Sequence, residues 1–415
     1  MEIGYACLTI GVDNSNFKNI TKKNLTKENL RIIIKHNLRS LENIIVYNVK
    51  NNIRMYRITS DLIPFGSSEL NNLDWEKEFK EEFDYIASII EKNKIRVSMH
   101  PGQYCVINSP DEDVVKRSFD DLRYHNKILD LLKVDYNCKI VLHVGGAYGD
   151  KKEAIERFIL NYQKLDKNIK KRLIIENDDK IFNIEDVLYI SKETNIPVVY
   201  DNLHNYVNPS NKGVMSDNFW LKKALKTWPS NQKMKTHYSQ QDTSKNKGAH
   251  TKTIFLKPFL KYFNELDVDA DIMLEVKDKN VSCIKCKNII IKNIEKSALE
   301  KEWSKYKYYI LERNQNDYKK IRELLKEEKN NLALEFYEII EKNINKEVSS
   351  LNGVEHVWGY FKKVADNREK NFYLKKIKEF EQNKAKTITS LKTFLYKLAN
   401  KYKNKYLLES YFFDL

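Results

Sequence analysis

Three short apolar runs read KIVLHVGG at residues 139–146, RLIIEND at 172–178 and PVVYDNLH at 197–204. Each run is rich in β-branched residues and leads into a histidine or a carboxylate, which is typical of a buried strand followed by a polar loop. The segments between the runs are long enough to hold a helix, so successive strands can point in the same direction. These runs therefore predict a parallel sheet covered by helices.

The same alternation extends in both directions along the chain. The other candidate strands are 3–8, 53–58, 95–99, 234–238 and 272–275. Amphipathic helical patterns stand between strands, for example at 75–92 and 115–134. Eight strand–helix units in about 300 residues match the size of an α/β (β/α)₈ TIM barrel. An open doubly wound sheet is the alternative, but no GxGxxG or GxxxxGK[ST] motif follows the first strand.

Residues 301–415 differ from the rest of the chain in composition. All seven prolines and nine of the eleven glycines precede residue 300, whereas this segment holds 25 basic and 17 acidic residues. Apolar residues at helical spacing predict helices at 318–329, 332–344, 369–383 and 387–405. We therefore expect a barrel domain over residues 1–300 and an all-helical, lysine-rich C-terminal domain over residues 301–415.

The charge balance points to the class of partner. Lysine and arginine number 73 against 58 acidic residues, which gives a net charge of +15 and favours a polyanion such as nucleic acid. No long apolar run and no export signal is evident, and the five cysteines are scattered. We therefore expect a cytoplasmic protein that does not bind a membrane.

Metal-capable side chains recur at or just past the carboxyl ends of the predicted strands. They are His100, His143, Glu176, Asp201, His204, His237, His250 and Glu275. A closed barrel brings these strand ends to one rim, so these side chains are expected to face one cavity. A lone histidine at such a place is more often structural, but five of the eight histidines share this location. Imidazole and carboxylate without thiolate suit Zn²⁺, Mn²⁺ or Fe²⁺, and so many ligands imply more than one ion.

Lys235 lies two residues before His237 and therefore points to the same face of its strand. Divalent cations would repel an ammonium group, so a lysine facing the site would be neutral, lie outside the ligand shell or become an anionic carbamate. The alternative is that Lys235 extends outward to solvent.

A multi-metal site on a basic protein predicts hydrolysis of a nucleic-acid phosphodiester, because bound ions acidify water and neutralise charge on phosphate oxygens. A metal-dependent sugar isomerase is one alternative, although it leaves the positive charge unexplained. A DNA-damage binding protein without catalytic activity is another.

Several motifs together carry a family resemblance. IRMYRITSDLIP (53–64), SMHPGQY (98–104), LHVGG (142–146), IIEND (174–178), KTHYS (235–239) and IMLEVKDK (272–279) resemble the UV damage endonuclease family, over about residues 1–290. The resemblance implies a DNA excision-repair enzyme that cuts immediately 5′ of cyclobutane or 6-4 photoproducts and leaves a 3′-hydroxyl and a 5′-phosphate. It implies Mn²⁺, two or three ions held by the eight candidate ligands, with no organic cofactor. It also implies catalytic roles for Glu176, Glu275, Lys235 and His237, and Lys235 matches a lysine of the family that can be carboxylated.

The resemblance further implies that damaged double-stranded DNA is the partner, with downstream repair enzymes acting next. The expected DNA contacts are Gln103, Tyr104, Tyr5, Arg57 and Lys277. For Arg57 and Lys277 the alternative is pairing with Asp61 and Asp278, and for Tyr104 it is packing at the barrel mouth. An abasic-site endonuclease on a related barrel is the nearest alternative function. Residues 301–415 are similar to a helical domain of unknown function, and we hypothesise that they add nonspecific affinity for the phosphate backbone.

Overall fold

A computed structural model describes residues 1–210, 213, 215–291, 294–329, 331–380 and 384–415. The chain divides into two compact units. The barrel unit comprises Met1–Thr9, Asn14–Ile254 and Pro258–Ile284, and the helical unit comprises Ile10–Asp13, Phe255–Lys257 and Lys285–Leu415. Within these described ranges, no helix combines the length and apolar character needed to cross a bilayer.

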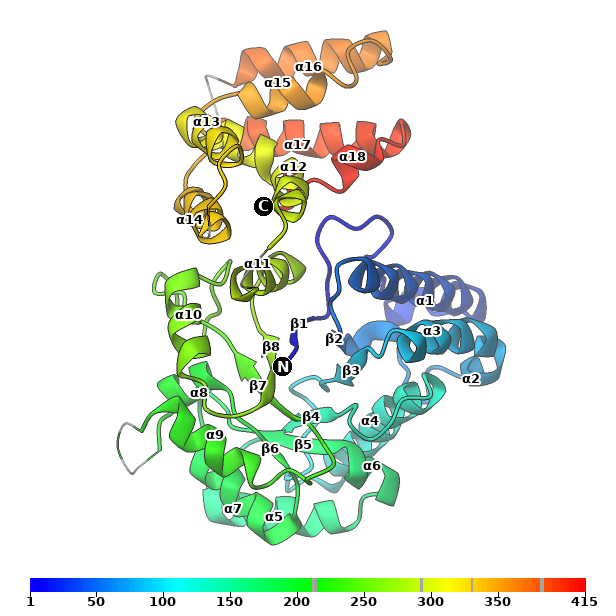
Figure 1. Cartoon of the computed structure of the whole chain (residues 1–415). Coiled ribbons are helices and arrows are strands. Elements are labelled where there is room, and N and C mark those ends of the chain that lie inside the picture. The colour runs from blue at the N-terminus through cyan, green and yellow to red at the C-terminus, as the bar shows by residue number, and fades with distance from the viewer. Residues whose placement is uncertain (211–212, 214, 292–293, 330, 381–383) are drawn as a thin grey trace. The chain divides into compact units, whose positions relative to one another are not determined.

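Eight parallel strands form a nearly closed barrel in the barrel unit (Figure 1). They are β1 (Ile3–Ala6), β2 (Met55–Ile58), β3 (Arg96–Met99), β4 (Ile140–His143), β5 (Leu173–Glu176), β6 (Val198–Val199), β7 (Met234–Tyr238) and β8 (Ala270–Leu274). Their hydrogen-bonded order is β6-β5-β4-β3-β2-β1-β8-β7. A parallel bridge between Asp201 and His237 joins the two ends of this order, and the His237 N–H donates to the Tyr200 carbonyl at 3.0 Å. The predicted TIM barrel is confirmed.

Helices surround the strands of the barrel unit. They are α1 (Lys27–Lys50), α2 (Trp75–Glu78), α3 (Lys80–Lys92), α4 (Glu112–Leu131), α5 (Lys151–Gln163), α6 (Lys167–Arg172), α7 (Ile184–Thr194), α8 (Asn202–Val207), α9 (Asp217–Leu225), α10 (Leu256–Glu265) and α11 (Asn280–Ile290). The single helix expected over 75–92 is divided, because Phe79 has φ −110° and ψ 23°. α4 begins three residues earlier than expected because the Asp111 side chain accepts hydrogen bonds from the Asp113 and Val114 N–H groups.

The strands are continuous apolar runs because both of their faces are buried. In β4, Ile140, Val141 and Leu142 are each at most 1 % exposed, and Phe158 of the neighbouring α5 is fully buried. This packed core fixes the strands, so the side chains at the strand ends are held in place by the barrel rather than by flexible loops.

The helical unit contains seven named helices in its described residues. They are α12 (Lys296–Arg313), α13 (Gln315–Leu324), α14 (Leu332–Ile344), α15 (Asn352–Trp358), α16 (Asn367–Glu379), α17 (Lys384–Lys401) and α18 (Lys405–Leu408). The four helices predicted by range correspond to α13, α14, α16 and α17, and the further helices α12, α15 and α18 agree with the prediction of an all-helical segment. α12 runs through residue 300, where the domain boundary was expected. Val354, Val357, Leu391 and Phe412 belong to the apolar core of this unit.

Candidate metal centre

The ends of neighbouring strands bring the candidate ligands together around Glu176. Glu176 is the last residue of β5 and is fully buried. The parallel register of β4 and β5 places His143 directly opposite Glu176. Asp201 precedes α8, where its carboxylate accepts a hydrogen bond from the His204 N–H at 2.8 Å and so begins that helix. Strand geometry and a helix cap therefore orient four of the candidates toward one point.

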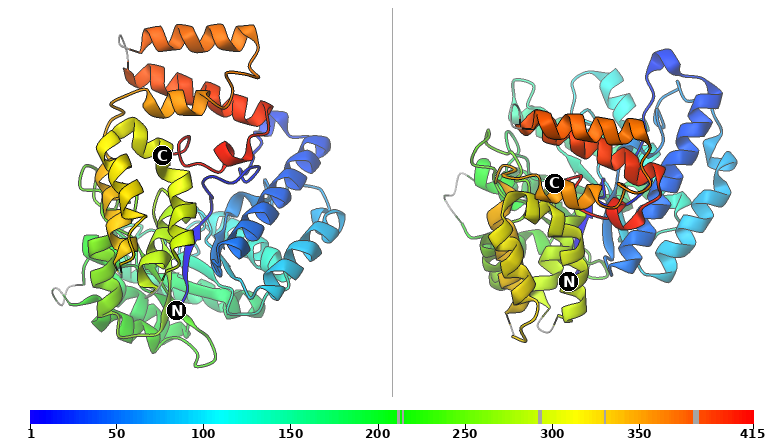
Figure 2. Two further views of the ribbon diagram at one scale, coloured as in Figure 1. Left: turned by 45° about the horizontal axis from the view of Figure 1, so that its top comes forward. Right: turned by 90° about the horizontal axis from the view of Figure 1, so that it is seen from above.

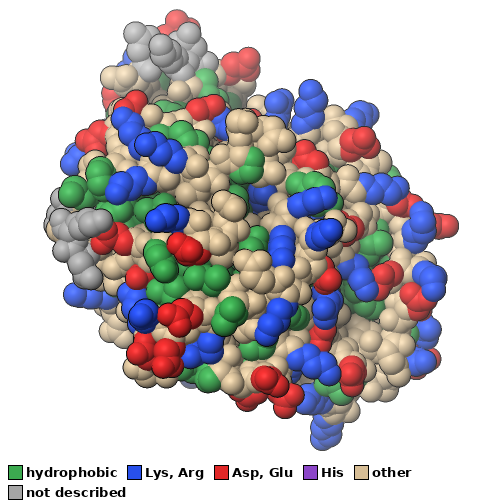
Figure 3. All heavy atoms as spheres, turned by 90° about the horizontal axis from the view of Figure 1, so that it is seen from below, with side chains coloured by type: hydrophobic (Ala, Val, Ile, Leu, Met, Phe, Trp, Pro, Cys, Tyr) green, Lys and Arg blue, Asp and Glu red, His purple; other side chains and the backbone are tan. Residues whose placement is uncertain are grey.

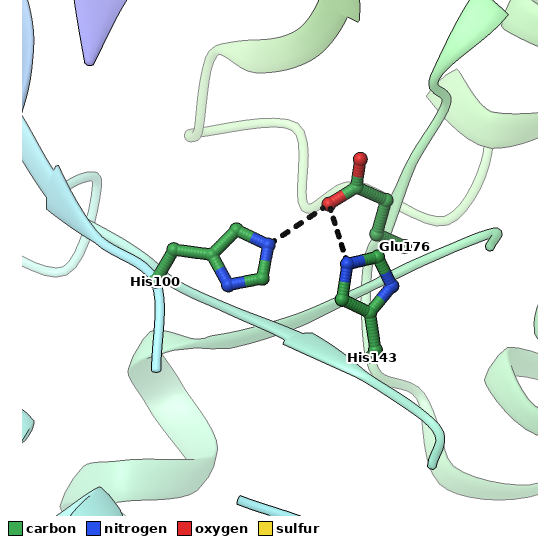
Figure 4. Close-up of side chains that lie close together, drawn as sticks. All are labelled: His100, His143 and Glu176. Carbon is green, nitrogen blue, oxygen red and sulfur yellow. Dashed lines mark hydrogen bonds and ion pairs between the residues drawn. The ribbon is translucent and has the colours of Figure 1, made fainter. Parts of the chain in front are cut away.

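The Glu176 carboxylate borders four imidazoles, two at each oxygen. Glu176 Oε2 lies 3.2 Å from His100 Nε2 and 3.9 Å from His143 Nε2 (Figure 4). Glu176 Oε1 lies 2.8 Å from His237 Nδ1 and 3.5 Å from His204 Nδ1. One buried carboxylate thus connects ligands that come from five segments of the barrel.

Three groups among the described residues place possible ligand atoms within 4.8 Å of one another. They are His100 with His143 and Glu176, Glu176 with His237 and Glu275, and Glu176 with Asp201 and His204. Glu176 belongs to all three groups. His250 lies outside these groups, and it forms an isolated antiparallel bridge with Gln241 in the loop after β7.

Buried polar atoms without partners show whether these residues fit metal ions. Among the residues that the structure describes, three buried atoms of this cluster have no hydrogen-bond partner: His143 Nδ1, Asp201 Oδ2 and His237 Nε2. Leaving such an atom unsatisfied costs about 1–3 kcal/mol, so a native site of this kind is expected to hold a ligand. Imidazole nitrogen and carboxylate oxygen are the donors that Mn²⁺, Zn²⁺ and Fe²⁺ accept. The donor set and the unpartnered atoms both fit divalent ions.

Charge balance sets the protonation states of this cluster. Burial lowers the pKa of His100 to about 4, so its imidazole is neutral at pH 7, as a metal ligand must be. Burial also opposes charge on His204, but the nearby carboxylates, Asp201 first, raise its pKa to about 9. Burial alone would raise the pKa of Glu176, yet the surrounding imidazoles, His237 first, hold it well below its usual value. Glu176 is therefore an anion at neutral pH.

Arg57 is an ion-pair partner inside the barrel. Its Nη1 lies 2.5 Å from Glu275 Oε1, and both side chains are 13 % exposed. Burial alone would raise the pKa of Glu275, but the guanidinium of Arg57 and then the imidazole of His237 together lower it. The alternative that Arg57 pairs with Asp61 is wrong, because its carboxylate partner is a candidate metal ligand.

Lys235 is held inside the barrel as well. Its side chain is 1 % exposed, and its Nζ donates to Ser98 Oγ at 3.2 Å. Burial first, and then the positive charges of Arg96 and Arg57, lower the pKa of Lys235 to about 7. The alternative that Lys235 extends outward to solvent is therefore wrong.

The residues expected to contact DNA lie in different environments. Gln103 and Tyr104 are exposed on the loop between β3 and α4, and Tyr104 is 84 % exposed rather than packed at the barrel mouth. Lys277 is exposed, and the adjacent ammonium of Lys245 lowers its pKa. Tyr5 is fully buried in β1, and its hydroxyl donates to Asn48 Oδ1 at 2.8 Å. Tyr5 is therefore a core residue in this structure, which corrects the expectation of a DNA contact.

A cavity of about 710 Å³ adjoins the candidate ligands and the exposed loop. His143 and His204 border it on the side of the metal candidates, and Gln103 and Tyr104 border it on the side of the loop. Its volume lies within the range of small-ligand sites. Figure 3 shows one face of the molecule on which basic and acidic side chains are intermingled, so net charge alone does not mark a DNA-binding surface there.

Asn177 is a supporting residue that sequence reasoning did not single out. It is fully buried, its Oδ1 accepts from the Asp201 N–H at 2.9 Å, and its Nδ2 donates to the Asp201 carbonyl at 3.0 Å. Its own carbonyl accepts from His204 Nδ1 at 2.9 Å, which leaves Nε2 of that ring for a metal ion. The available signal was its position directly after Glu176 in IIEND.

Comparisons with known proteins agree with these observations. The sequence model described as UV-endonuclease UvdE matches residues 2–307, and a second, described as a protein of unknown function (DUF1722), matches residues 307–415. The chain is 43 % identical over 395 residues to the UV DNA damage endonuclease of Clostridium perfringens, which covers 93 % of this chain and 94 % of that protein. It is 33 % identical over 252 residues to the UV DNA damage endonuclease of Bacillus velezensis, covering 60 % and 78 % of the two chains. The crystal structure of SacUVDE matches with a TM-score of 0.65 and 38 % identity, covering 69 % of this chain and 96 % of that one.

Proposed function

Because this chain belongs to the UV-endonuclease UvdE family, we propose that it incises DNA at UV photoproducts in excision repair. The cut would fall at the phosphodiester immediately 5′ of a cyclobutane dimer or a 6-4 product and would leave a 3′-hydroxyl and a 5′-phosphate. The observation that most supports a hydrolytic site is the sharing of Glu176 by three groups of possible metal ligands. The 3′-hydroxyl would then be available to downstream repair enzymes.

We propose that the metals are two or three divalent ions, with Mn²⁺ as the resident metal. The residues that would hold them are His100, His143, Glu176, Asp201, His204, His237, His250 and Glu275. When bound, such ions make water acidic enough to attack near neutral pH and neutralise charge on the phosphodiester oxygens. Glu176 and Glu275 are proposed to anchor the ions, because each is anionic and each lies within hydrogen-bonding distance of His237.

The chain's own residues keep these ligands in position. Asn177 fixes the backbone of Asp201 through two hydrogen bonds, and the His204 N–H donates to the Asp201 carboxylate. Arg57 holds the carboxylate of Glu275 through their ion pair. Residues that contact the metal ligands without binding the metal orient those ligands and tune their basicity.

Lys235 is proposed to act as a carbamate after reaction with carbon dioxide. Only a neutral amine can add to carbon dioxide, and a pKa of about 7 leaves a large neutral fraction of Lys235 under cellular conditions. The product is an anion, which suits a place near divalent cations better than an ammonium group does. Lys235 and His237 are therefore proposed to complete the catalytic set with the two glutamates.

We propose that the exposed loop after β3 recognises the lesion. Extruding a damaged dinucleotide leaves a gap in the duplex, and Gln103 and Tyr104 present a planar amide and a ring that could fill it. The adjoining cavity of about 710 Å³ is proposed to receive the extruded nucleotides. Lys277 is proposed to bind a phosphate as an exposed point charge.

The test uses the purified full chain, Mn²⁺ and an end-labelled duplex that carries one photoproduct. We expect a single product that ends immediately 5′ of the lesion, no product with a chelator, and none with the undamaged duplex. A matched duplex that carries an abasic site in place of the photoproduct tests for the alternative activity of an abasic-site endonuclease. Incision of the abasic duplex alone would contradict the proposed substrate, and incision that persists after complete metal removal would contradict the proposed chemistry.

A further inference from the structure

A groove that the metal centre does not explain runs along α17 and is bordered by Phe372 of α16. Figure 2 shows the two helices side by side, in orange and red. The groove has a volume of about 570 Å³, and its lining includes Phe372, Lys386, Thr389, Thr393, Phe394 and Lys397. It therefore combines aromatic rings, hydroxyl groups and lysines, and every one of these residues belongs to the helical unit.

The aromatic part of the groove is a supported stack. The rings of Phe372 and Phe394 have centroids 4.7 Å apart. Phe394 is 6.3 Å from Trp358, which stacks on Tyr373 at 4.2 Å with an interplanar angle of 11°. Tyr373 is buried, whereas Phe372 is 38 % exposed. The core thus holds a series of rings in place and leaves the outermost ring open to a ligand.

The walls of the groove carry positive charge. Helix α17 contains five lysines and no acidic residue over Lys384–Lys401. Lys392 pairs with Glu312 and Lys401 with Glu369, whereas two other lysines of this helix line the groove. Lys386 and Lys397, both exposed, line the groove eleven positions apart, which is about 16 Å along a helix. An apolar protein partner would leave these charges to be desolvated, so the charge favours a polyanion that also offers flat apolar faces.

We propose that this groove binds single-stranded DNA, with a base stacked on Phe372 and phosphates contacting Lys386 and Lys397. Aromatic platforms beside a basic track are the general means of binding single strands, because every base has a π-face. A duplex hides those faces within its stack, so the Phe372 ring favours a single strand. The choice of DNA over RNA rests on the proposed function of the barrel unit as a DNA endonuclease.

The test measures binding of fluorescein-labelled oligothymidylate to the full chain by fluorescence anisotropy at several salt concentrations. Phe372→Ala and Phe372→Leu both remove the ring face, and Leu keeps an apolar side chain in the fold. We expect each to weaken binding about tenfold. The matched control is Tyr189→Ala, which removes an exposed aromatic ring from α7 and should leave the affinity unchanged.

The charge arm uses the double substitution Lys386→Gln with Lys397→Gln. Loss of two phosphate contacts should reduce the slope of log affinity against log salt by about 1.4, since each contact on a single strand contributes about 0.7. The matched control replaces Lys319 and Lys320, two exposed lysines of α13 outside the groove, and should keep the wild-type slope.

Three outcomes would overturn the inference. They are wild-type affinity in both Phe372 variants, a slope reduced equally by the α13 control, and tighter binding of an oligouridylate of the same length than of oligothymidylate. Incision of the photoproduct duplex by the same preparations separates this result from the proposed function. Groove variants that lose oligothymidylate binding but still incise would support the inference, whereas wild-type protein without incision would contradict the proposed function alone.

Discussion

Glu176→Gln is the substitution that most specifically perturbs the candidate metal centre. Glutamine keeps the shape of the side chain and one carbonyl oxygen, but it removes the negative charge and replaces the second acceptor with a donor. The side chain is fully buried, so solvent cannot compensate for the lost charge. Because Glu176 belongs to all three candidate groups, one change affects every proposed ion.

The expected size of the effect follows from these contacts. Replacing a residue that only orients a ligand typically costs 10–100-fold in metal affinity or activity. Glu176 is itself a candidate ligand and is shared, so we expect Mn²⁺ affinity and incision rate each to fall by at least about 100-fold, which is about 2.7 kcal/mol. Without metal, the variant also loses the charge-assisted hydrogen bonds of Glu176 to His100 and His237, which contribute about 1.5–3 kcal/mol each to stability. This loss is partly offset because the variant no longer buries a charged carboxylate.

The assay pairs two measurements on the same preparations. Electron paramagnetic resonance measures the concentration of free Mn²⁺, and subtracting it from the total gives the number of bound ions. Incision of the photoproduct duplex is followed over a range of Mn²⁺ concentrations. Circular dichroism establishes that the variant is folded. The matched control is Glu193→Gln, which changes an exposed carboxylate on α7. A folded Glu176→Gln protein with wild-type Mn²⁺ stoichiometry and wild-type incision would refute the assignment of Glu176 as the shared ligand.

Three further predictions concern the surroundings of the site and the stability of the barrel. Arg57→Met breaks the buried ion pair with Glu275 and should lower the free energy of unfolding, measured with urea in the absence of metal, by about 3–5 kcal/mol. Bound Mn²⁺ should reduce this loss of stability. An equal loss with and without Mn²⁺ would count against metal binding by Glu275. Gly145→Ala should lower stability by roughly 1–3 kcal/mol in thermal unfolding, because Gly145 has φ +118° and an added Cβ would lie 2.2 Å from Asn108 Oδ1; an unchanged melting temperature would show that the loop relaxes freely. Burial lowers the pKa of Lys139 from 10.5 to about 8. Between these two pH values the unfolded chain binds more protons than the folded protein, and the free energy of unfolding of the wild-type protein therefore rises with pH. Compared with Lys139→Met, the wild-type protein should gain about 2 kcal/mol between about pH 7 and about pH 9.5, and parallel pH profiles would contradict a depressed pKa.

The strand pattern made the barrel and the approximate place of its site predictable. Buried parallel strands are continuous apolar runs, so their ends are visible in sequence, and barrel closure then brings those ends together. This is why His100, His143 and Glu176 could be grouped although they lie far apart in the chain. Their mutual distances within 4.8 Å follow from the register of the strands, which the sequence pattern does not specify.

Side-chain environments at the strand ends were less predictable. Tyr5 is amphipathic, and a strand pattern does not distinguish a tyrosine whose hydroxyl meets Asn48 in the core from one that faces DNA. Arg57 has one carboxylate nearby in the sequence, Asp61, and only the fold reveals that Glu275, more than 200 positions away, is its partner. Asn177 could not be assigned a role because its contacts with Asp201 depend on the approach of β5 and β6.

Anomalous diffraction from crystals of the Mn²⁺-loaded protein, collected at the manganese absorption edge, tests the shared metal centre most directly. We predict two or three peaks, each within coordination distance of ligand atoms in the groups that contain Glu176. Crystals of incision-competent protein with peaks only elsewhere, or with no peak beside Glu176, would contradict the central claim.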